Sequence, residues 1–392
     1  MAYTMSPAIQ YVGTMLERLD DIEGNLHPIV QIAEQAADRL VAGGKLYAAA
    51  DEKGFISEAC GRAGGMMMIR SAPDASQIGD RDVVLMGTLD LNPDEQRVQI
   101  RAMRKAGAVV ILFGSDASPL SNEADELVPS FLPAGAAPLI QVKDQAEKIC
   151  PAGTVGNITA LWVLTAELVA ACTRRGKMPT MYQSVYLSTS RDRNARYQPY
   201  AFHEDLKVPP VPPGQAGRAY LTEIRRCFRG LRDHQIPFFE EGGWIVAEVI
   251  TSGHKAWGLV LGHHLPHQFG LPGDPGLLDP SLQGKTADQM LATIGKGDAL
   301  VYVGYYDCPE VNWQPVRDAG YTSVWITGAR ESKRVVPRSG EIHIDPYWTY
   351  RDACVEIPSY DVNILPPSGV IQTAALWMII GEIAKALSKR VF

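Results

Sequence analysis

Two stretches of the sequence, one in the middle and one at the end, match each other without a gap. The first extends from Pro151 to Glu167 and the second from Pro366 to Glu382, and both contain Ala-Leu-Trp at the same offset. Each begins with proline and glycine and continues as an apolar run, the pattern of a loop that leads into a buried helix. This recurrence predicts that the chain consists of two homologous halves.

The size and charge of the chain restrict its class. At 392 residues it exceeds one ordinary core, so two domains are expected. A net charge of −7 gives no electrostatic case for nucleic acid. The N-terminus lacks the basic and apolar regions of a signal peptide. The most apolar predicted helix reaches Glu382 and Lys385 before membrane-spanning length. No membrane partner is therefore expected.

The cysteines indicate the redox compartment. Six cysteines are scattered along the chain, and none forms a Cys-x-x-Cys pair. This arrangement favours reduced thiols in a cytoplasm over a disulfide framework or a zinc ribbon.

In the first half, helical and extended patterns alternate. Apolar residues at helical spacing from Ile9 to Leu40 predict one long or two consecutive helices that end at Gly43-Gly44. Strands are expected at 45–50, 82–87, 109–113 and 138–142, and helices at 55–62, 92–105 and 151–173. This order predicts a mostly parallel α/β sheet covered on both faces. Ligands of such sheets bind beyond the carboxyl ends of the strands.

A polar, proline-rich stretch separates the halves. It predicts a first domain at 1–176, a linker at 177–216 and a second domain at 217–392. The length of the linker is compatible with wrapping over the other domain.

The second half repeats the order of elements. An entry helix at 220–231 is followed by a strand at 242–250, which matches the Gly-Gly-led first strand. By this alignment Thr251-Ser-Gly-His254 follows the strand as the first loop, and Trp257 takes the place of Glu58. Further strands are expected at 297–304, 322–326 and 340–344.

The segment Glu58-Ala-Cys-Gly-Arg-Ala-Gly-Gly65 resembles the Glu-x-x-Gly/Tyr-Arg-Ala-Gly-Gly helix of some members of the sugar isomerase (SIS) domain family. The resemblance extends to the order of elements over nearly the whole chain. It implies two flavodoxin-like, doubly wound, mostly parallel-sheet domains in tandem that bind phosphosugars. It also implies halves packed face to face, a homodimer formed through the entry helices, and no organic cofactor.

The strand-end loops depart from the family pattern. The usual first loop is Gly-x-Gly-x-Ser, whereas this chain has Asp51-Glu-Lys-Gly-Phe55. The usual second loop is a Ser-x-Ser-Gly run that holds phosphate, whereas this chain carries Asp90 and Asp307 in the two corresponding loops. These carboxylates would repel a phosphate. These departures weaken the inference that the loops bind phosphate. They do not affect the inference that the chain has the fold of this family.

Glu58 and His254 are the candidate catalytic residues. Aldose–ketose isomerisation requires a base, and phosphoheptose isomerases carry a catalytic glutamate in a similar Glu-x-x-Gly-Arg. The alternative for Glu58 is a solvated first-turn residue favoured by the helix dipole. Histidine side chains commonly serve as acids or bases in catalysis, so His254 could supply the second group. The alternative for its loop is a plain strand-to-helix turn.

Arg62 could hold an anionic substrate group, or it could pair with Glu58 one turn away. The other candidate substrate-binding residues lie on predicted strand-end loops, where small and polar side chains allow close approach of a ligand. They are Lys53, Gly54, Thr88, Asn92, Ser115, Thr251, Ser252 and Gly253, with Ser118 as a further hydroxyl. Ordinary turns use the same residue types for their own backbone.

His263, His264 and His267 invite a metal interpretation because imidazoles are common ligands. Pro266 interrupts their helical spacing, and no nearby carboxylate pattern completes a site. A polar loop at a domain or subunit contact is the alternative, and no metal is expected.

Three functions remain open at this point. The first is binding of a sugar or sugar phosphate with aldose–ketose isomerisation through an enediol, with Glu58 as the base. The second is a non-catalytic sugar-phosphate sensor or regulatory subunit. The third is a structural pseudoenzyme.

Overall fold

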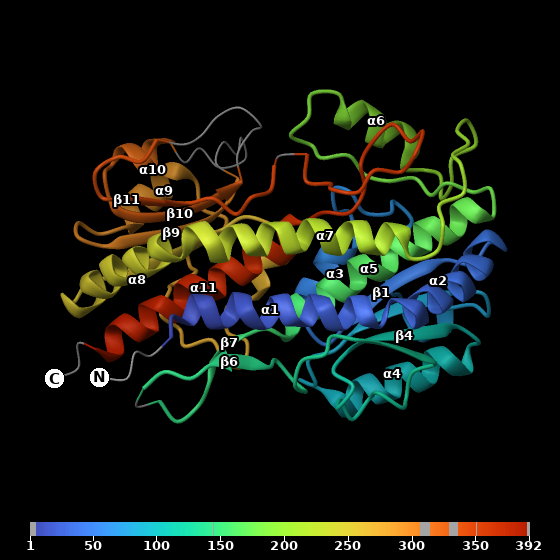
Figure 1. Ribbon diagram of the computed structural model, residues 1–392, viewed down its shortest axis with the longest axis horizontal. Coiled ribbons are helices and arrows are strands. Elements are labelled where there is room, and N and C mark those ends of the chain that lie inside the picture. Colours follow the sequence, from blue (N-terminus) through green and yellow to red (C-terminus); the bar gives the residue numbers. More distant parts are fainter. Residues whose placement is uncertain (1–4, 144, 306–313, 329–335, 350, 390–392) are drawn as a thin grey trace.

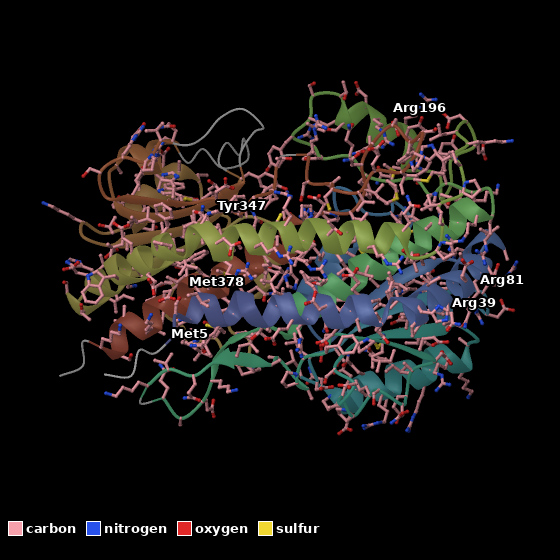
Figure 2. The ribbon with its side chains drawn as sticks, in the orientation of Figure 1. Met5, Arg39, Arg81, Arg196, Tyr347 and Met378 are labelled. Atoms are coloured by element: carbon pink, nitrogen blue, oxygen red, sulfur yellow. The ribbon has the colours of Figure 1, made fainter. Side chains whose placement is uncertain are left out.

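The computed structural model describes residues 5–143, 145–305, 314–328, 336–349 and 351–389. Long helices form a central layer with a parallel sheet on either side (Figure 1). These helices are α1 (Pro7–Gly24), α2 (Leu26–Val41), α5 (Gly153–Arg174), α7 (Gln215–Gly230), α8 (Ile236–Thr251) and α11 (Ser368–Ser388). A π-helical turn (Leu231–Gln235) joins α7 to α8. Met378 of α11 lies among these helices (Figure 2).

The first sheet has the order β2-β1-β3-β4-β5, and all of its strands are parallel. The strands are β1 (Leu46–Ala50), β2 (Ile69–Ser71), β3 (Val83–Gly87), β4 (Val109–Gly114) and β5 (Glu126–Pro129). Helix α3 (Lys53–Ala59) follows β1, a short 3₁₀ turn (Ala75–Gln77) precedes β3, and α4 (Pro93–Lys105) covers the outer face. The strand predicted at 138–142 exists as β6 (Pro138–Ile140). It pairs antiparallel with β7 (Ile149–Pro151) instead of joining the sheet.

The second sheet has the order β11-β10-β9-β8 and is also parallel. Its strands are β8 (Ala256–Val260), β9 (Ala299–Tyr305), β10 (Thr322–Gly328) and β11 (Glu341–Ile344). Helices α9 (Ala287–Thr293) and α10 (Gln314–Asp318) lie on its outer side. The prediction of α/β architecture with parallel sheets covered on both faces is confirmed.

One apolar core joins the two halves. A single buried cluster contains residues of α1, α2, α5, α7, α8 and α11 together with the inner faces of both sheets. Trp162 and Trp377, the tryptophans of the two matching stretches, are fully buried in it. The boundaries proposed at 176/177 and 216/217 stay a prediction, because the core is continuous across them.

The two matching helices make equivalent contacts. Glu167 on α5 accepts hydrogen bonds from the backbone N–H groups of Gly214 (2.8 Å) and Gly217 (2.7 Å) at the start of α7. Glu382 on α11 accepts from the N–H of Ala8 (3.0 Å) and from the Ser6 hydroxyl at the start of α1. A carboxylate at a helix N-terminus satisfies unpaired N–H groups and complements the dipole. Each closing helix therefore anchors the entry helix of the other half.

The strand predicted at 242–250 is wrong, because these residues belong to α8. Residues 245–250 are rich in β-branched side chains and follow two glycines, a pattern that also fits a strand. In the structure these glycines have a packing role inside a helix. A Cβ on Gly243 would lie 2.6 Å from the Cβ of Glu382 and 2.7 Å from its carbonyl carbon. Glycine thus lets α8 approach α11 closely, at a cost in helix propensity that packing overrides.

The predicted linker packs closely on the rest of the protein. We call residues 178–205 the strap. It contains α6 (Ser190–Tyr197) and carries the labelled Arg196 at the outer edge of the molecule (Figures 1 and 2). Backbone bonds join Tyr182 to Gly64 and Gly65 at 2.8 and 2.9 Å. Arg193 binds both carboxylate oxygens of Asp361 at 2.7 and 2.8 Å. The strap is therefore fixed to both halves.

By length and composition, α5 and α11 could each cross a membrane; among the described residues no further helix qualifies. The expectation that the last helix meets Glu382 and Lys385 before membrane-spanning length is wrong, since α11 has 21 residues and is long and apolar enough. The apolar windows of the two helices are 100% and 89% buried inside the protein. Core helices share this property, so these helices are weak evidence for a membrane span.

The close approach of α8 and α11 generates a test. We expect Gly243→Ala to lower the free energy of unfolding by about 1–3 kcal/mol, because the new methyl group overpacks the contact with Glu382. Gly13→Ala in α1 is the matched control. Its Cβ would meet nothing within 4 Å, so better helix propensity should raise stability by about 0.5–1 kcal/mol. Urea unfolding followed by circular dichroism measures both. Equal stability of the two variants would contradict the packing explanation.

Candidate functional site

The first-half loop that should hold phosphate is occupied by a side chain of the protein. Asp51, directly after β1, accepts hydrogen bonds from the backbone N–H groups of Leu89 (3.0 Å) and Leu91 (2.8 Å). These N–H groups follow β3, where the family resemblance places the phosphate. Burial raises the pKa of Asp51, although the two N–H donors oppose the shift. A carboxylate of the chain thus takes the place of an external anion.

The neighbouring hydroxyls are also engaged in local structure. Thr88 donates to the side-chain oxygen of Gln96 at 2.6 Å. Ser118 donates to Asp90 at 2.6 Å, and Ser115 accepts from a backbone N–H two residues on. Asn92 precedes α4 but makes no side-chain cap. The structure places these predicted residues in neighbouring turns, where their hydroxyl groups form hydrogen bonds within the loops themselves. Asp307, their predicted counterpart, lies outside the described residues.

The predicted loop Thr251–His254 lies at the wrong end of the second sheet. It connects α8 to the amino end of β8, whereas ligands bind at the carboxyl ends. Thr251 and Ser252 donate back to helix carbonyls, and Gly253 has a φ of 83°, as a helix C-terminus favours. His254 lies 3.8 Å from Asp298. This placement follows from the misassigned strand and does not favour the catalytic and binding roles predicted for the loop, which stay predictions.

Glu58 and Arg62 form a buried ion pair on and just after α3. The Arg62 guanidinium contacts Glu58 at 3.1 Å and Asp352 at 2.8 Å, and it donates to the Ser368 hydroxyl. Asp352 also accepts from the Tyr305 hydroxyl at 3.0 Å. Glu58 is 0% exposed and Arg62 3%. The predicted pairing one turn apart is confirmed, and the network joins α3 of the first half to the start of α11.

The charge state of Glu58 follows from this pairing. Burial alone would raise the pKa of Glu58, but Arg62 together with the nearby His264 and His263 outweighs burial and holds the pKa below its usual value. An ionised, fully buried carboxylate with a lowered pKa is a weaker base than isomerisation calls for. One of its oxygens, Oε2, has no hydrogen-bond partner among the described residues.

The counterpart of Glu58 in the second half is Gln268, not Trp257. Both lie at the same offset from the start of β1 and β8. The indole N–H of Trp162 donates to Glu58 and that of Trp377 donates to Gln268, each at 3.3 Å. Correct alignment of the repeat could have found this residue. An amide cannot act as a base, so the second half lacks an equivalent of Glu58.

The three histidines have separate partners around α3. His263 Nδ1 lies 3.1 Å from the Ser57 carbonyl, and His267 Nε2 lies 3.2 Å from the Ser57 hydroxyl. The buried His264 contacts Thr373 at 3.0 Å. Within the described part of the chain, no group of three His, Cys, Asp or Glu side chains could hold a metal. The cluster forms a polar contact between the halves.

A cavity of about 390 Å³ lies at the carboxyl ends of β8 and β9, and we call it the sheet-end cavity. Its wall combines the end of α3 at Arg62, the loop after β8 at His263, the end of β9 at Tyr305, and strap residues 182–186. Among the predicted site residues only Arg62 lines it. Lys53 is exposed at the start of α3, and Gly54 packs against His264.

The electrostatics of the sheet-end cavity favour hydroxyl groups. His263 Nδ1 must donate to the Ser57 carbonyl, so in the neutral ring Nε2 is an acceptor. Loss of water around the ring, and next the Arg62 cation, lower the pKa of His263 and keep the ring neutral at pH 7. Arg62 is matched by two carboxylates, so the wall carries no excess positive charge.

Comparison with known proteins supports the architecture. No protein-family model matches the sequence, and no curated protein matches it significantly. Similar solved structures include a proposed sugar-binding protein from Salmonella typhimurium (TM-score 0.52, 10% identity, covering 96% of this chain and 99% of that one). The C-terminal domain of glucosamine-fructose-6-phosphate aminotransferase from Francisella tularensis is also similar (TM-score 0.52, 10% identity, covering 99% of this chain and 96% of that one). A proposed phosphosugar isomerase from Clostridium difficile is similar with a TM-score of 0.51 and 10% identity, covering 97% of this chain and 93% of that one.

These structures align with 96–99% of the chain. The chain has the sugar isomerase fold. Within this fold, the sheet-end cavity of the second half is open, while the corresponding loop of the first half is filled by Asp51.

The buried network of the sugar isomerase fold gives a stability test. We expect Arg62→Met to lower the free energy of unfolding by about 3–5 kcal/mol, because it leaves Glu58 and Asp352 as buried, unpaired charges. Arg101→Met, which breaks a surface pair with Glu123, should leave stability nearly unchanged. Adding Glu58→Gln to Arg62→Met should recover part of the loss. Chemical denaturation measures all of these, and an Arg62 variant as stable as the Arg101 variant would contradict the network's role.

Proposed function

We propose that the protein binds a phosphosugar, or a closely related sugar derivative, in the sheet-end cavity. The observation that carries this proposal is the position of the cavity at the carboxyl ends of β8 and β9, with His263, Tyr305 and Arg62 in its wall. Ligands of open parallel sheets bind at this edge. The volume of about 390 Å³ lies in the range of small-molecule sites.

The chemistry of the wall supports a polyol. Neutral His263 offers Nε2 to a sugar hydroxyl, whereas the Tyr305 hydroxyl and the Arg62 guanidinium are already bonded within the buried network. The similar solved structures, which are described as sugar-binding and phosphosugar proteins, support the same ligand class.

The geometry favours binding without catalysis. Glu58 is fully covered and ion-paired, the second half has Gln268 in its place, and Asp51 closes the first-half loop. The protein therefore acts as a sugar-phosphate sensor or regulatory subunit. We also propose that it acts in the cytoplasm as a homodimer, in keeping with its composition and family resemblance.

Calorimetric titration tests the binding. Glucose, fructose and glucosamine 6-phosphates are titrated alongside the free sugars and inorganic phosphate. We expect one of the sugar phosphates to bind, and His263→Ala to weaken its binding by about tenfold through loss of one hydrogen bond, about 1.4 kcal/mol. His234→Ala, an exposed histidine on the helical layer, is the matched control and should not change affinity. Equal effects of the two variants, or no binding of any sugar derivative, would contradict the proposal.

One observation favours an isomerase as the second candidate. Oε2 of Glu58 has no described hydrogen-bond partner, and the adjacent Arg62 lines the cavity. If Glu58 reaches the ligand, the wild type interconverts glucose and fructose 6-phosphates, and Glu58→Gln abolishes turnover while binding persists. We expect no turnover in the wild type, as measured by NMR of the sugar mixture. Turnover lost in the Gln variant would establish the isomerase instead.

A further inference from the structure

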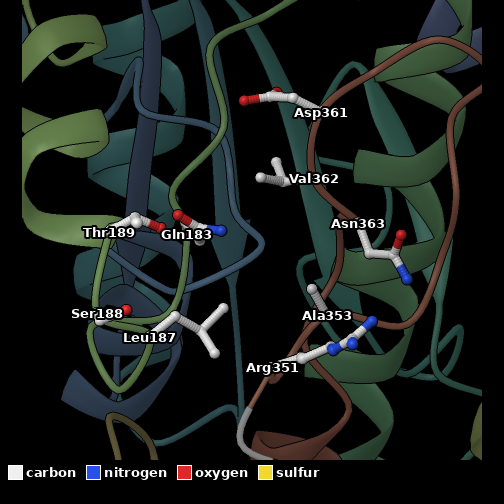
Figure 3. A pocket seen from close by; sticks show the side chains of 9 residues that line it. All are labelled: Gln183, Leu187, Ser188, Thr189, Arg351, Ala353, Asp361, Val362 and Asn363. Carbon is white, nitrogen blue, oxygen red and sulfur yellow. The ribbon is translucent and has the colours of Figure 1, made fainter.

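A second cavity adjoins the sheet-end cavity. Its volume is about 400 Å³, and it lies between strap residues 187–189 and the segment 351–363 of the second half (Figure 3). We call it the strap cavity. Gln183 belongs to the linings of both cavities, so the two cavities are neighbours along the strap. A ligand longer than one ring could therefore occupy both.

Gln183 is held in place at this boundary by its backbone. Its N–H donates to the side-chain oxygen of Asn194 at 2.9 Å, and its carbonyl accepts from the amide of Asn194 at 2.8 Å. The side-chain oxygen of Gln183 is buried and has no partner among the described residues. In Figure 3 the amide nitrogen of Gln183 faces the gap between the strap and the segment 351–363, and the oxygen is turned toward the strap. This oxygen has no surface open to the cavity, so Gln183 lies at the boundary without offering that acceptor to a ligand.

The lining of the strap cavity is largely polar, with aliphatic patches and one residue of each charge. Ser188, Thr189 and Asn363 supply hydroxyl and amide groups, while Leu187 and Val362 supply apolar surface. Thr189 precedes α6 without capping it through its side chain. Hydroxyl edges and C–H faces are the two surfaces of a sugar ring, so this lining matches a carbohydrate.

The charges around the strap cavity do not favour a phosphate. Arg351 and Asp361 both line it and are opposite in sign. Asp361 is held by Arg193 on the strap, which fixes one wall. A phosphate site calls for a concentration of positive charge or of helix N-terminal N–H groups, and neither is present in this lining.

We propose that the strap cavity is a second subsite, which binds an uncharged sugar or polyol ring attached to the phosphosugar in the sheet-end cavity. This inference rests on the proposed function and narrows it to disaccharide-like phosphates. The ligand then passes Gln183 where it crosses from one cavity to the other.

The test compares ligands with one and two rings. Glucose, fructose and glucosamine 6-phosphates are titrated against trehalose, sucrose and lactose 6-phosphates. We expect the best disaccharide phosphate to bind at least tenfold more tightly than the best hexose phosphate. Thr189→Val and Asn363→Leu should each remove much of this advantage and leave hexose phosphate affinity unchanged. Thr222→Val, the same change on the exposed face of α7, is the control and should alter neither affinity.

The outcomes separate this inference from the function on which it rests. Hexose phosphates that bind as tightly as every disaccharide phosphate would overturn the second subsite and leave the proposed function standing. Strap-cavity variants that weaken both ligand classes equally would also overturn it. If no sugar derivative binds at all, both proposals fail.

Discussion

The buried contact between Arg62 and its two carboxylates determines how the halves of this protein meet. Arg62 comes from the end of α3 in the first half, Asp352 from the second half, and Ser368 from the start of α11. Because three buried charges are expensive unless all are paired, this contact fixes the relative position of the two halves. The same guanidinium forms a wall of the sheet-end cavity. One side chain therefore contributes both to the association of the halves, together with their shared apolar core, and to the shape of the candidate site.

The two halves share their framework and differ in their sites. Glu167 and Glu382 anchor the exchanged entry helices in the same way, and Trp162 and Trp377 bind equivalent residues. The residues at the strand ends have diverged. Asp51 closes one loop with a carboxylate of the chain, whereas the other sheet end retains a cavity under the strap. Such asymmetry suits a protein that binds one ligand and needs no second acid or base.

Much of the fold could be predicted because apolar periodicity and the Ala-Leu-Trp recurrence are local signals. The error came from 242–250, where β-branched residues and two glycines fit a strand equally well. Only the packing of Gly243 against Glu382 shows why a helix tolerates glycine there. Because 242–250 was assigned to a strand, the loop Thr251–His254 was predicted at the wrong end of the sheet. The same assignment made Trp257, and not Gln268, the counterpart of Glu58. Asp352 could not be found from sequence, because its contact with Arg62 depends on long-range folding.

The most direct test of the account is a crystal structure of the protein with the tightest-binding sugar phosphate. We predict that the ligand lies in the sheet-end cavity, with a sugar hydroxyl donating to His263 Nε2 and with the Glu58–Arg62–Asp352 network unchanged. A ligand bound instead at the first-half loop, with Asp51 displaced from the N–H groups of Leu89 and Leu91, would contradict the assignment of an open site to the second half and a closed one to the first.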